Sequence, residues 1–340
     1  MINTYYAYYY EQLNARDQGV YRKLLMCFQN MSEKCQLLGI HDINYVSRMI
    51  EIIRRDYPGM FYLRSEYNYS KDALGLNLSF RYYYSRETAM QLERQISIFT
   101  EQFRRQIATP DRSVYYRLLA IQMYLQRNVK YDPVVAAGNY GTQEDYTIIG
   151  PLIKKMGVCQ GIAFTVKLLC DILRIKCIVV AGETRQLGIS GKHAWNMVWV
   201  DGKSYHMDLT GDLLKEKNAI CKDRYFLVDD NLISVNHIWD RSKYPVCRWS
   251  DLDYYSLRGM VAYSKPQIQE LLYQQICRGE KTISFRCAIP YISDNEILAL
   301  AQEAAKKFCR NYNRSINEFR RTSLQLDREF KIALIQYSDR

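Results

Sequence analysis

The sequence predicts a mixed α+β protein, and two kinds of hydrophobic pattern lead to this prediction. Several segments repeat apolar residues every three or four positions, as amphipathic helices do. Others alternate apolar and polar residues over short runs bounded by glycine or proline, as strands do. The chain has 340 residues, of which 48% are hydrophobic and 24% charged. This composition is ordinary for a globular protein and leaves ample material for a buried core.

The N-terminal region reads as helical from about residue 5 to residue 57, where Pro58 and Gly59 end the pattern. Two strands are expected next, over 60–69 and 74–84, the second because Leu74, Leu76, Leu78 and Phe80 alternate with polar residues. A helix over 85–107 follows, with Ser85 as its N-cap.

Pro110 and Asp111 mark a boundary, and a helix over 114–127 opens the central region. The C-terminal region, from about residue 251, again alternates helix and strand: helix 266–277, strand 282–288, helix 295–310 and strand 330–337. We therefore expect an N-terminal helical or α+β region (1–110), a core (111–250) and a C-terminal α+β region (251–340). The sequence at 78–81 faintly resembles that at 283–286, which is weak evidence for a repeat.

Composition excludes several classes of protein. The net charge of +11 raises the question of nucleic-acid binding, but the basic residues are dispersed among acidic ones and form no known motif. No apolar run is long enough for a membrane helix, and the N-terminus lacks the features of a signal peptide. Ten cysteines without paired spacing are typical of free thiols in a reducing compartment. We therefore expect a cytoplasmic protein without a cofactor, and the sequence does not indicate its oligomeric state.

The strongest candidate nucleophile is Cys159, within Gly157-Val-Cys-Gln-Gly161. Apolar residues at 162, 166, 169 and 173 follow it at helical spacing, so Cys159 begins an amphipathic helix. The helix dipole and the unpaired backbone N–H groups stabilise a thiolate there and can receive an oxyanion. The two glycines would let a substrate backbone approach closely. A buried structural cysteine is the alternative.

A β-hairpin brings two further candidates together. Asp201-Gly202 between two alternating runs predicts a two-residue turn in which Val200 faces Lys203. In that register His193 lies diagonal to Asp208 on one face, at a Cβ separation of about 7–8 Å, so an imidazole–carboxylate hydrogen bond is within reach.

The two faces of this hairpin differ in character. Apolar side chains dominate one face, which we interpret as core. The other carries His193, Trp195, His206 and Asp208, and we interpret it as the wall of a cleft.

The resulting hypothesis is a triad: Cys159 as nucleophile, His193 as general base and Asp208 as the residue that orients His193. His206 is an alternative base, although it points parallel to Asp208 and reads better as a supporting or surface residue. A zinc site formed by the triad residues with His206 lacks the short ligand spacing of zinc fingers, so we predict no metal.

These motifs together resemble the signature of bacterial transglutaminase-like proteins, a branch of the papain-like superfamily. The resemblance extends from about residue 113 to 247 and rests on these segments: Gly157-Val-Cys-Gln-Gly161, His193-Ala-Trp-Asn196, Asp208-Leu-Thr210, Tyr131-Asp132, His237-Ile-Trp-Asp240 and Tyr244-Pro245. It implies a papain-like α+β core with helix-rich α/β flanking regions at both ends. One departure is Ile162, where family members often carry an aromatic residue.

The resemblance also implies acyl transfer on amides, with the triad on Cys159, His193 and Asp208. We expect a cysteine peptidase or amidase that acts on proteins or peptides through a thioester. The alternatives are a protein-crosslinking transglutaminase and a binding protein without turnover. Candidate substrate-binding residues are Gln160, Trp195 and Gln143; Tyr140 or Gln143 are candidates for completing the oxyanion hole.

Overall fold

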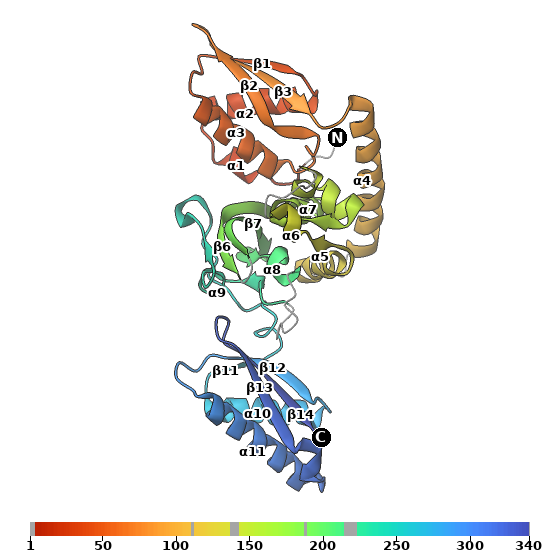
Figure 1. Cartoon of the computed structure of the whole chain (residues 1–340), viewed down its shortest axis with the longest axis vertical. Coiled ribbons are helices and arrows are strands. Elements are labelled where there is room, and N and C mark those ends of the chain that lie inside the picture. Colours follow the sequence, from red (N-terminus) through yellow and green to blue (C-terminus); the bar gives the residue numbers. More distant parts are fainter. Residues whose placement is uncertain (1–3, 110–111, 137–142, 187–188, 214–222, 340) are drawn as a thin grey trace. The chain divides into compact units, whose positions relative to one another are not determined.

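The computed structural model describes residues 4–109, 112–136, 143–186, 189–213 and 223–339 (Figure 1). The chain forms two compact units. The first comprises Met1–Leu213 and His237–Cys247, and the second comprises Leu214–Asn236 and Arg248–Arg340. Both contain helices and antiparallel sheet, so the α+β prediction is confirmed. Within the described ranges, no helix is long and apolar enough to span a bilayer.

The first unit begins with helices packed on a three-stranded antiparallel sheet of order β1-β3-β2. Its elements are α1 (Tyr8–Glu11), α2 (Ala15–Gln29), β1 (Lys34–Leu38), α3 (Ile43–Asp56), β2 (Leu63–Lys71) and β3 (Gly75–Tyr82). The prediction of continuous helix over 5–57 was wrong, because β1 interrupts it. Only Cys35 and Leu37 of that strand are buried, so its alternation is too short to stand out between two helices.

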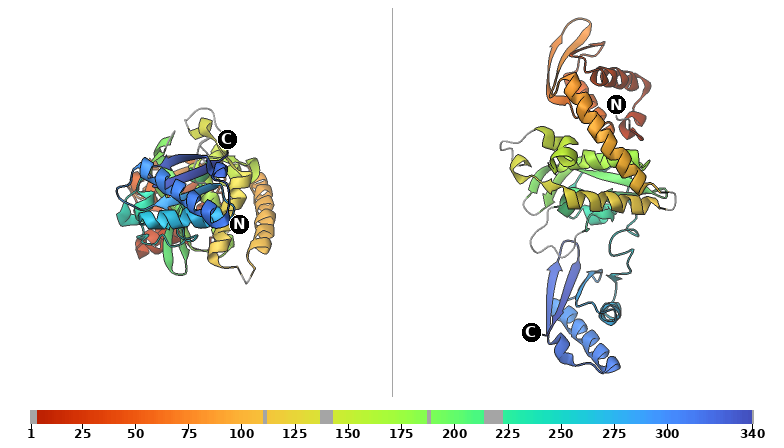
Figure 2. Two further views of the ribbon diagram at one scale, coloured as in Figure 1. Left: turned by 90° about the horizontal axis from the view of Figure 1, so that it is seen from below. Right: turned by 90° about the vertical axis from the view of Figure 1, so that its right-hand side faces the viewer.

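The 22-residue helix α4 (Arg86–Ile107) links this sheet to the rest of the unit (Figures 1 and 2). It begins as predicted, with the Ser85 hydroxyl accepting a hydrogen bond from the Thr88 backbone N–H at 3.2 Å. Its apolar stripe is interrupted by polar residues, yet Ile96 and Phe103 are buried.

The core of the first unit packs helix α7 against four neighbouring strands of one sheet, in the order β10-β6-β7-β8. The other helices of this unit lie around α7 and the sheet. The elements are α5 (Val114–Asn128), β4 (Lys130–Tyr131), α6 (Pro133–Ala136), η1 (Gln143–Tyr146), η2 (Gly150–Lys154), β5 (Met156–Gly157), α7 (Cys159–Ile172), β6 (Cys177–Gln186), β7 (Ile189–Val200), β8 (Lys203–Met207), α8 (Leu209–Leu213), β10 (His237–Ile238) and η3 (Arg241–Lys243). Helix α7 is buried from Gly161 to Asp171, because it lies inside the unit and not on its surface.

The second unit packs two helices against a four-stranded sheet of order β11-β12-β14-β13. Its elements are β9 (Phe226–Val228), α9 (Asp230–Ile233), β11 (Val261–Ala262), α10 (Lys265–Cys277), β12 (Thr282–Cys287), α11 (Asp294–Tyr312), η4 (Ile316–Phe319), β13 (Arg321–Asp327) and β14 (Ile332–Ser338). The sequence did not predict β13. This strand pairs with β14 alone and has no fully buried residue, so its hydrophobic signal is weak.

The two units contain the same topological module. The order helix, strand, helix, strand, strand describes α2-β1-α3-β2-β3 and also α10-β12-α11-β13-β14. In both, the last strand lies between the other two, as β1-β3-β2 and β12-β14-β13. The sequence similarity between 78–81 and 283–286 compares β3 with β12, whereas the topology matches β3 with β14. A repeat therefore exists at the level of topology, in a different alignment from the one that the sequence suggested.

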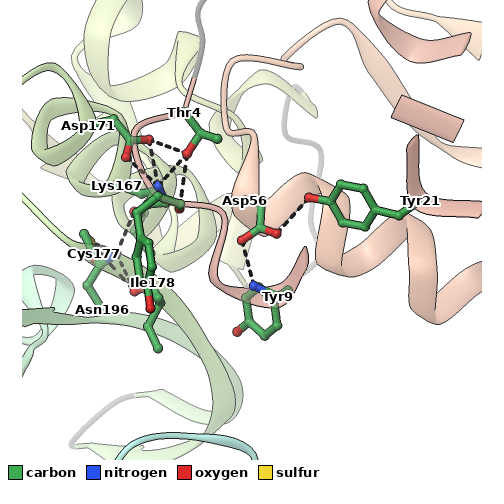
Figure 3. A network of polar contacts seen from close by, with 11 residues as sticks. Thr4, Tyr9, Tyr21, Asp56, Lys167, Asp171, Cys177, Ile178 and Asn196 are labelled. Carbon is green, nitrogen blue, oxygen red and sulfur yellow. Dashed lines mark hydrogen bonds and ion pairs between the residues drawn. The ribbon is translucent and has the colours of Figure 1, made fainter. Parts of the chain in front are cut away.

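Two buried polar clusters attach the N-terminal segment to the first unit (Figure 3). The Lys167 ammonium donates to both Asp171 carboxylate oxygens, at 2.6 and 2.7 Å, and to the Thr4 hydroxyl at 2.9 Å. The Asp56 carboxylate accepts from the backbone of Tyr9 and Tyr10 and from the Tyr21 hydroxyl, the last at 2.7 Å.

The second of these clusters keeps a carboxyl group inside the protein. Burial raises the pKa of Asp56 to about 6, although the hydrogen bonds that it accepts oppose this change. Together the two clusters fix the segment from Thr4 to Glu11 between α3 and α7.

The Lys167–Asp171 pair predicts a stability effect. Lys167→Met should lower the free energy of unfolding by about 3–5 kcal/mol, because it leaves the Asp171 charge buried without its partner. The double variant Lys167→Met/Asp171→Leu should recover most of that loss, since neither charge remains. Urea denaturation of the two variants measures both values. Equal losses would mean that the pair stabilises the protein through packing alone.

Candidate active site

The site begins at the first turn of α7, where Cys159 is partly exposed. The residue before it, Val158, has an extended backbone, and no side chain caps the helix. The free N–H groups of this first turn therefore lie beside the thiol, as the sequence predicted. Gln160 fixes the adjoining segment, because its side-chain amide donates to the Tyr146 carbonyl at 3.0 Å.

The glycines around Cys159 serve a different purpose from the one expected. A Cβ atom at Gly161 would lie 2.2 Å from the Asp145 carbonyl oxygen and 2.8 Å from that of Thr147. A Cβ atom at Gly157 would lie 2.9 Å from the Pro151 ring. The close neighbours are thus the Asp145 and Thr147 carbonyls and the Pro151 ring of the chain itself, and not a substrate. These glycines allow the 143–154 segment to pack against the start of α7.

The β7–β8 hairpin has the predicted register. Val200 pairs with Lys203, and the pairing continues to Asn196 with Met207. His193 lies on β7 three residues before Asn196, and its Nε2 atom is 2.9 Å from Asp208 Oδ2. Both side chains are almost completely buried. The Asp208 Oδ1 atom accepts from the Thr210 backbone N–H at 3.0 Å, which fixes the carboxylate.

His237 also binds Asp208, and the sequence analysis gave it no role. Its Nε2 atom lies 3.0 Å from Asp208 Oδ2, the oxygen that His193 contacts. The residue belongs to β10, which pairs antiparallel with β6 next to the hairpin. A carboxylate only accepts hydrogen bonds, so both rings donate to it from Nε2. The only sequence signal was the presence of His237 in the motif at 237–240.

The electrostatics favour a charged His193–Asp208 pair. Burial opposes the charge on Asp208, but His193 and His237 together hold the pKa of this carboxyl well below its usual range. Burial likewise opposes a charged His193, but the Asp208 carboxylate and the Cys159 sulfur raise its pKa to about 10. The Nδ1 atom of His193 has no hydrogen-bond partner among the described residues, and the residue lines the same cavity as Cys159.

The other face of the hairpin is buried, so our interpretation of it as a cleft wall was wrong. Trp195 is 1% exposed and His206 is 0% exposed. The Trp195 indole N–H donates to His206 Nδ1 at 3.0 Å. Trp239 covers both rings, with centroid distances of 6.0 Å to Trp195 and 5.0 Å to His206. A distant segment thus closes this face, and His206 is buried and does not lie at the surface.

A cavity of about 770 Å³ connects Cys159 and His193 with solvent. Gln160 and Tyr146 line it, but Trp195 and Gln143 do not. Gln143 is exposed and accepts a hydrogen bond from the Tyr83 hydroxyl at 3.1 Å. Of the three expected substrate-binding residues, only Gln160 therefore faces this cavity. Tyr140, the other expected oxyanion-hole candidate, lies outside the described residues.

One group of potential metal ligands overlaps the site. It consists of His193, Asp208 and His237, and one possible ligand atom of each residue lies within 4.8 Å of those of the other two. The Asp208 Oδ2 atom accepts a hydrogen bond from each of the two imidazoles. These hydrogen bonds explain why the three side chains lie so close together. The zinc site that the sequence analysis set aside would use His206, whose Nδ1 accepts a hydrogen bond from the Trp195 indole.

Comparison with known proteins gives one family match and two distant structural similarities. Residues 101–209 match the transglutaminase-like superfamily core. Among solved structures, a protein from Cytophaga hutchinsonii assigned as a cysteine protease is similar over 44% of this chain and 45% of its own, with 19% identity and a TM-score of 0.30. A TGase is similar over 54% of this chain and 52% of its own, with 14% identity and a TM-score of 0.33.

These solved structures are distant, and the chain spans about half the length of each. No curated protein matches the sequence. The family match includes Cys159 and His193 and ends one residue after Asp208. The chain therefore contains a domain of the transglutaminase-like superfamily, with an α+β core.

Proposed function

We propose that this protein is a cysteine hydrolase that cleaves amide bonds in proteins or peptides. The observation that carries the proposal is that His193, which is hydrogen-bonded to Asp208, lines the same cavity as Cys159 at the start of α7. Each component has a chemical task that the other residues cannot perform. The sulfur supplies a nucleophile, the ring moves a proton, and the carboxylate keeps the ring charged and oriented.

The first half of the reaction forms a thioester. The Cys159 thiolate attacks the amide carbon, a C–S bond forms, and the carbonyl π electrons move to oxygen. The N–H groups at the start of α7 stabilise this oxyanion. The intermediate collapses as the C–N bond breaks, and the His193 imidazolium gives its proton to the departing amine.

The second half releases the product to water. Neutral His193 takes a proton from a water molecule, whose oxygen attacks the thioester carbon. The C–S bond then breaks, which gives a carboxylic acid and restores the thiolate and imidazolium. If a lysine amine took the place of water, the same steps would form a crosslink.

Selective alkylation tests the nucleophile. At pH 6, iodoacetamide should modify Cys159 faster than Cys277, although Cys277 is the more exposed thiol. The reason is that the first turn of α7 and the His193 ring can activate the Cys159 sulfur as a nucleophile, whereas Cys277 ends helix α10 and does not line this cavity. Peptide mapping by mass spectrometry after brief labelling measures both rates.

The His193→Ala variant provides the control for this experiment. It should slow labelling of Cys159 without changing that of Cys277, which has no part in the site. Faster labelling of Cys277 or of Cys170 in the unaltered protein would contradict the assignment of the nucleophile.

A peptide mixture tests the reaction itself. The protein is incubated with synthetic peptides that contain every residue type, together with a biotinylated primary amine. New peptide ends that appear with the unaltered protein, and not with Cys159→Ala, would support hydrolysis. Incorporation of the amine would instead identify a transglutaminase. If neither occurs, the proposal is wrong and a binding module without turnover becomes the better description.

A further inference from the structure

The N-terminal module contributes side chains to the catalytic cavity. Glu51, Arg54 and Arg55 of α3 and Ser65 of β2 line the same cavity as Cys159. All of these residues belong to the first compact unit. The module therefore forms part of the place where a substrate would bind, and its charges affect what can enter.

Most charged groups of the cavity wall have a partner of opposite charge. Arg55 pairs with Glu51 at 3.1 Å. Asp240 pairs with Lys243 at 2.9 Å. Glu183 and Lys192 face each other across strands β6 and β7, where opposite charges attract.

Arg54 is the exception among the charged residues that line this cavity. Its Nη1 atom donates to the neutral Ser65 hydroxyl at 2.8 Å, and no ion pair joins it to a carboxylate among the described residues. A guanidinium has five N–H donors, so most of its donors remain for other partners. Burial lowers the pKa of Arg54, although Glu51, Tyr83 and Glu66 act in the opposite direction.

We infer that Arg54 binds a carboxylate of the substrate, close to the amide bond that Cys159 attacks. This inference rests on the proposed function, because the protein has a substrate only if it carries out that reaction. A carboxylate is the group that a guanidinium fork recognises best, through two parallel hydrogen bonds. Binding would also remove the cost of a partly dehydrated charge that lacks a counterion. The carboxylate belongs either to an Asp or Glu side chain or to the C-terminus of a peptide.

Alkylating probes test this inference without any turnover. Cys159 is treated with a series of N-iodoacetyl amino acids whose carboxylate lies at increasing distance from the reactive carbon, and with the matching neutral amides. At one length the carboxylate probe should react about tenfold faster than its amide, a ratio that corresponds to about 1.4 kcal/mol. Arg54→Gln should abolish this preference.

Two variants make the result specific to Arg54. Arg48→Gln removes an exposed charge from the same helix, outside the cavity lining, and should keep the preference. Arg54→Lys should keep part of it, because the charge stays but the two-pronged geometry is lost. If the ratio is independent of probe length, or if Arg54→Gln keeps the preference while its melting temperature is normal, the inference is wrong.

Peptide substrates then identify the source of the carboxylate. One set compares internal Glu with internal Gln in peptides with amidated ends, and another compares free with amidated C-termini in peptides without acidic residues. A preference of about ten- to hundredfold in kcat/KM, lost in Arg54→Gln, should appear in one set. Hydrolysis without any such preference would overturn the inference and leave the proposed function intact. An Arg54-dependent probe preference without hydrolysis would instead overturn the proposed function.

Discussion

His193→Ala should reduce turnover by about 10²- to 10⁴-fold, because it removes the group that carries protons to and from the reacting atoms. His193 is the imidazole that contacts both Asp208 and the catalytic cavity. Steady-state rates on a peptide cleaved by the unaltered protein measure the loss, and the melting temperature shows whether the fold survives.

The matched control is His206→Asn. His206 accepts from the Trp195 indole through Nδ1, and an asparagine side chain can present an acceptor at a similar position. This variant should keep most of its activity. Equal losses in the two variants would show that His193 is not the base, or that the buried contacts of Trp195 control the site.

Asp208→Asn should lower kcat by as much as about 10⁴-fold, because an amide can neither stabilise the imidazolium nor hold the ring in the required tautomer. It should also move the alkaline limb of the pH profile to lower pH. Asp208 helps to raise the pKa of His193 to about 10, so the ring stays charged below that pH. Without the carboxylate, burial is left to lower the pKa, and the charge is lost earlier as pH rises.

The pH profile separates catalytic positioning from mere stabilisation. A carboxylate that only supported the fold would change the melting temperature, but not the pH at which activity falls. The measurement is kcat/KM between pH 5 and pH 10.5 for both proteins. An unchanged alkaline limb in Asp208→Asn would mean that another group, such as the Cys159 sulfur, determines the charge of the ring.

The presence of His237 gives Asp208 a second anchor. Three hydrogen bonds, from His193, His237 and the Thr210 backbone, hold the carboxylate in place. A carboxylate held in this way cannot rotate away from His193 when the charge of the ring changes during a reaction. Precise positioning of this kind is what a proton-transfer step requires.

The two topological modules have different surroundings. The N-terminal one contributes Arg54, Arg55 and Ser65 to the cavity that Cys159 and His193 line. The C-terminal one belongs to the second compact unit, with its own hydrophobic core around α10, α11 and β12. The same arrangement of helices and strands therefore provides a cavity wall in one unit and an independent core in the other.

The sequence by itself determined those parts of the site that depend on neighbours along the chain. Apolar residues at helical spacing placed Cys159 at the start of a helix, and Asp201-Gly202 fixed the hairpin register that brings His193 to Asp208. A two-residue turn leaves little freedom in strand pairing, so a local motif was sufficient there.

Only the tertiary structure placed His237 on Asp208, Trp239 over Trp195, and Arg54 in the cavity wall. It also showed that Gly161 is required by the Asp145 carbonyl and not by a ligand. Each of these contacts joins segments that are separated by many residues and by several helices and strands. Hydrophobic periodicity reports which face of an element is buried, but it does not encode which distant segment covers that face.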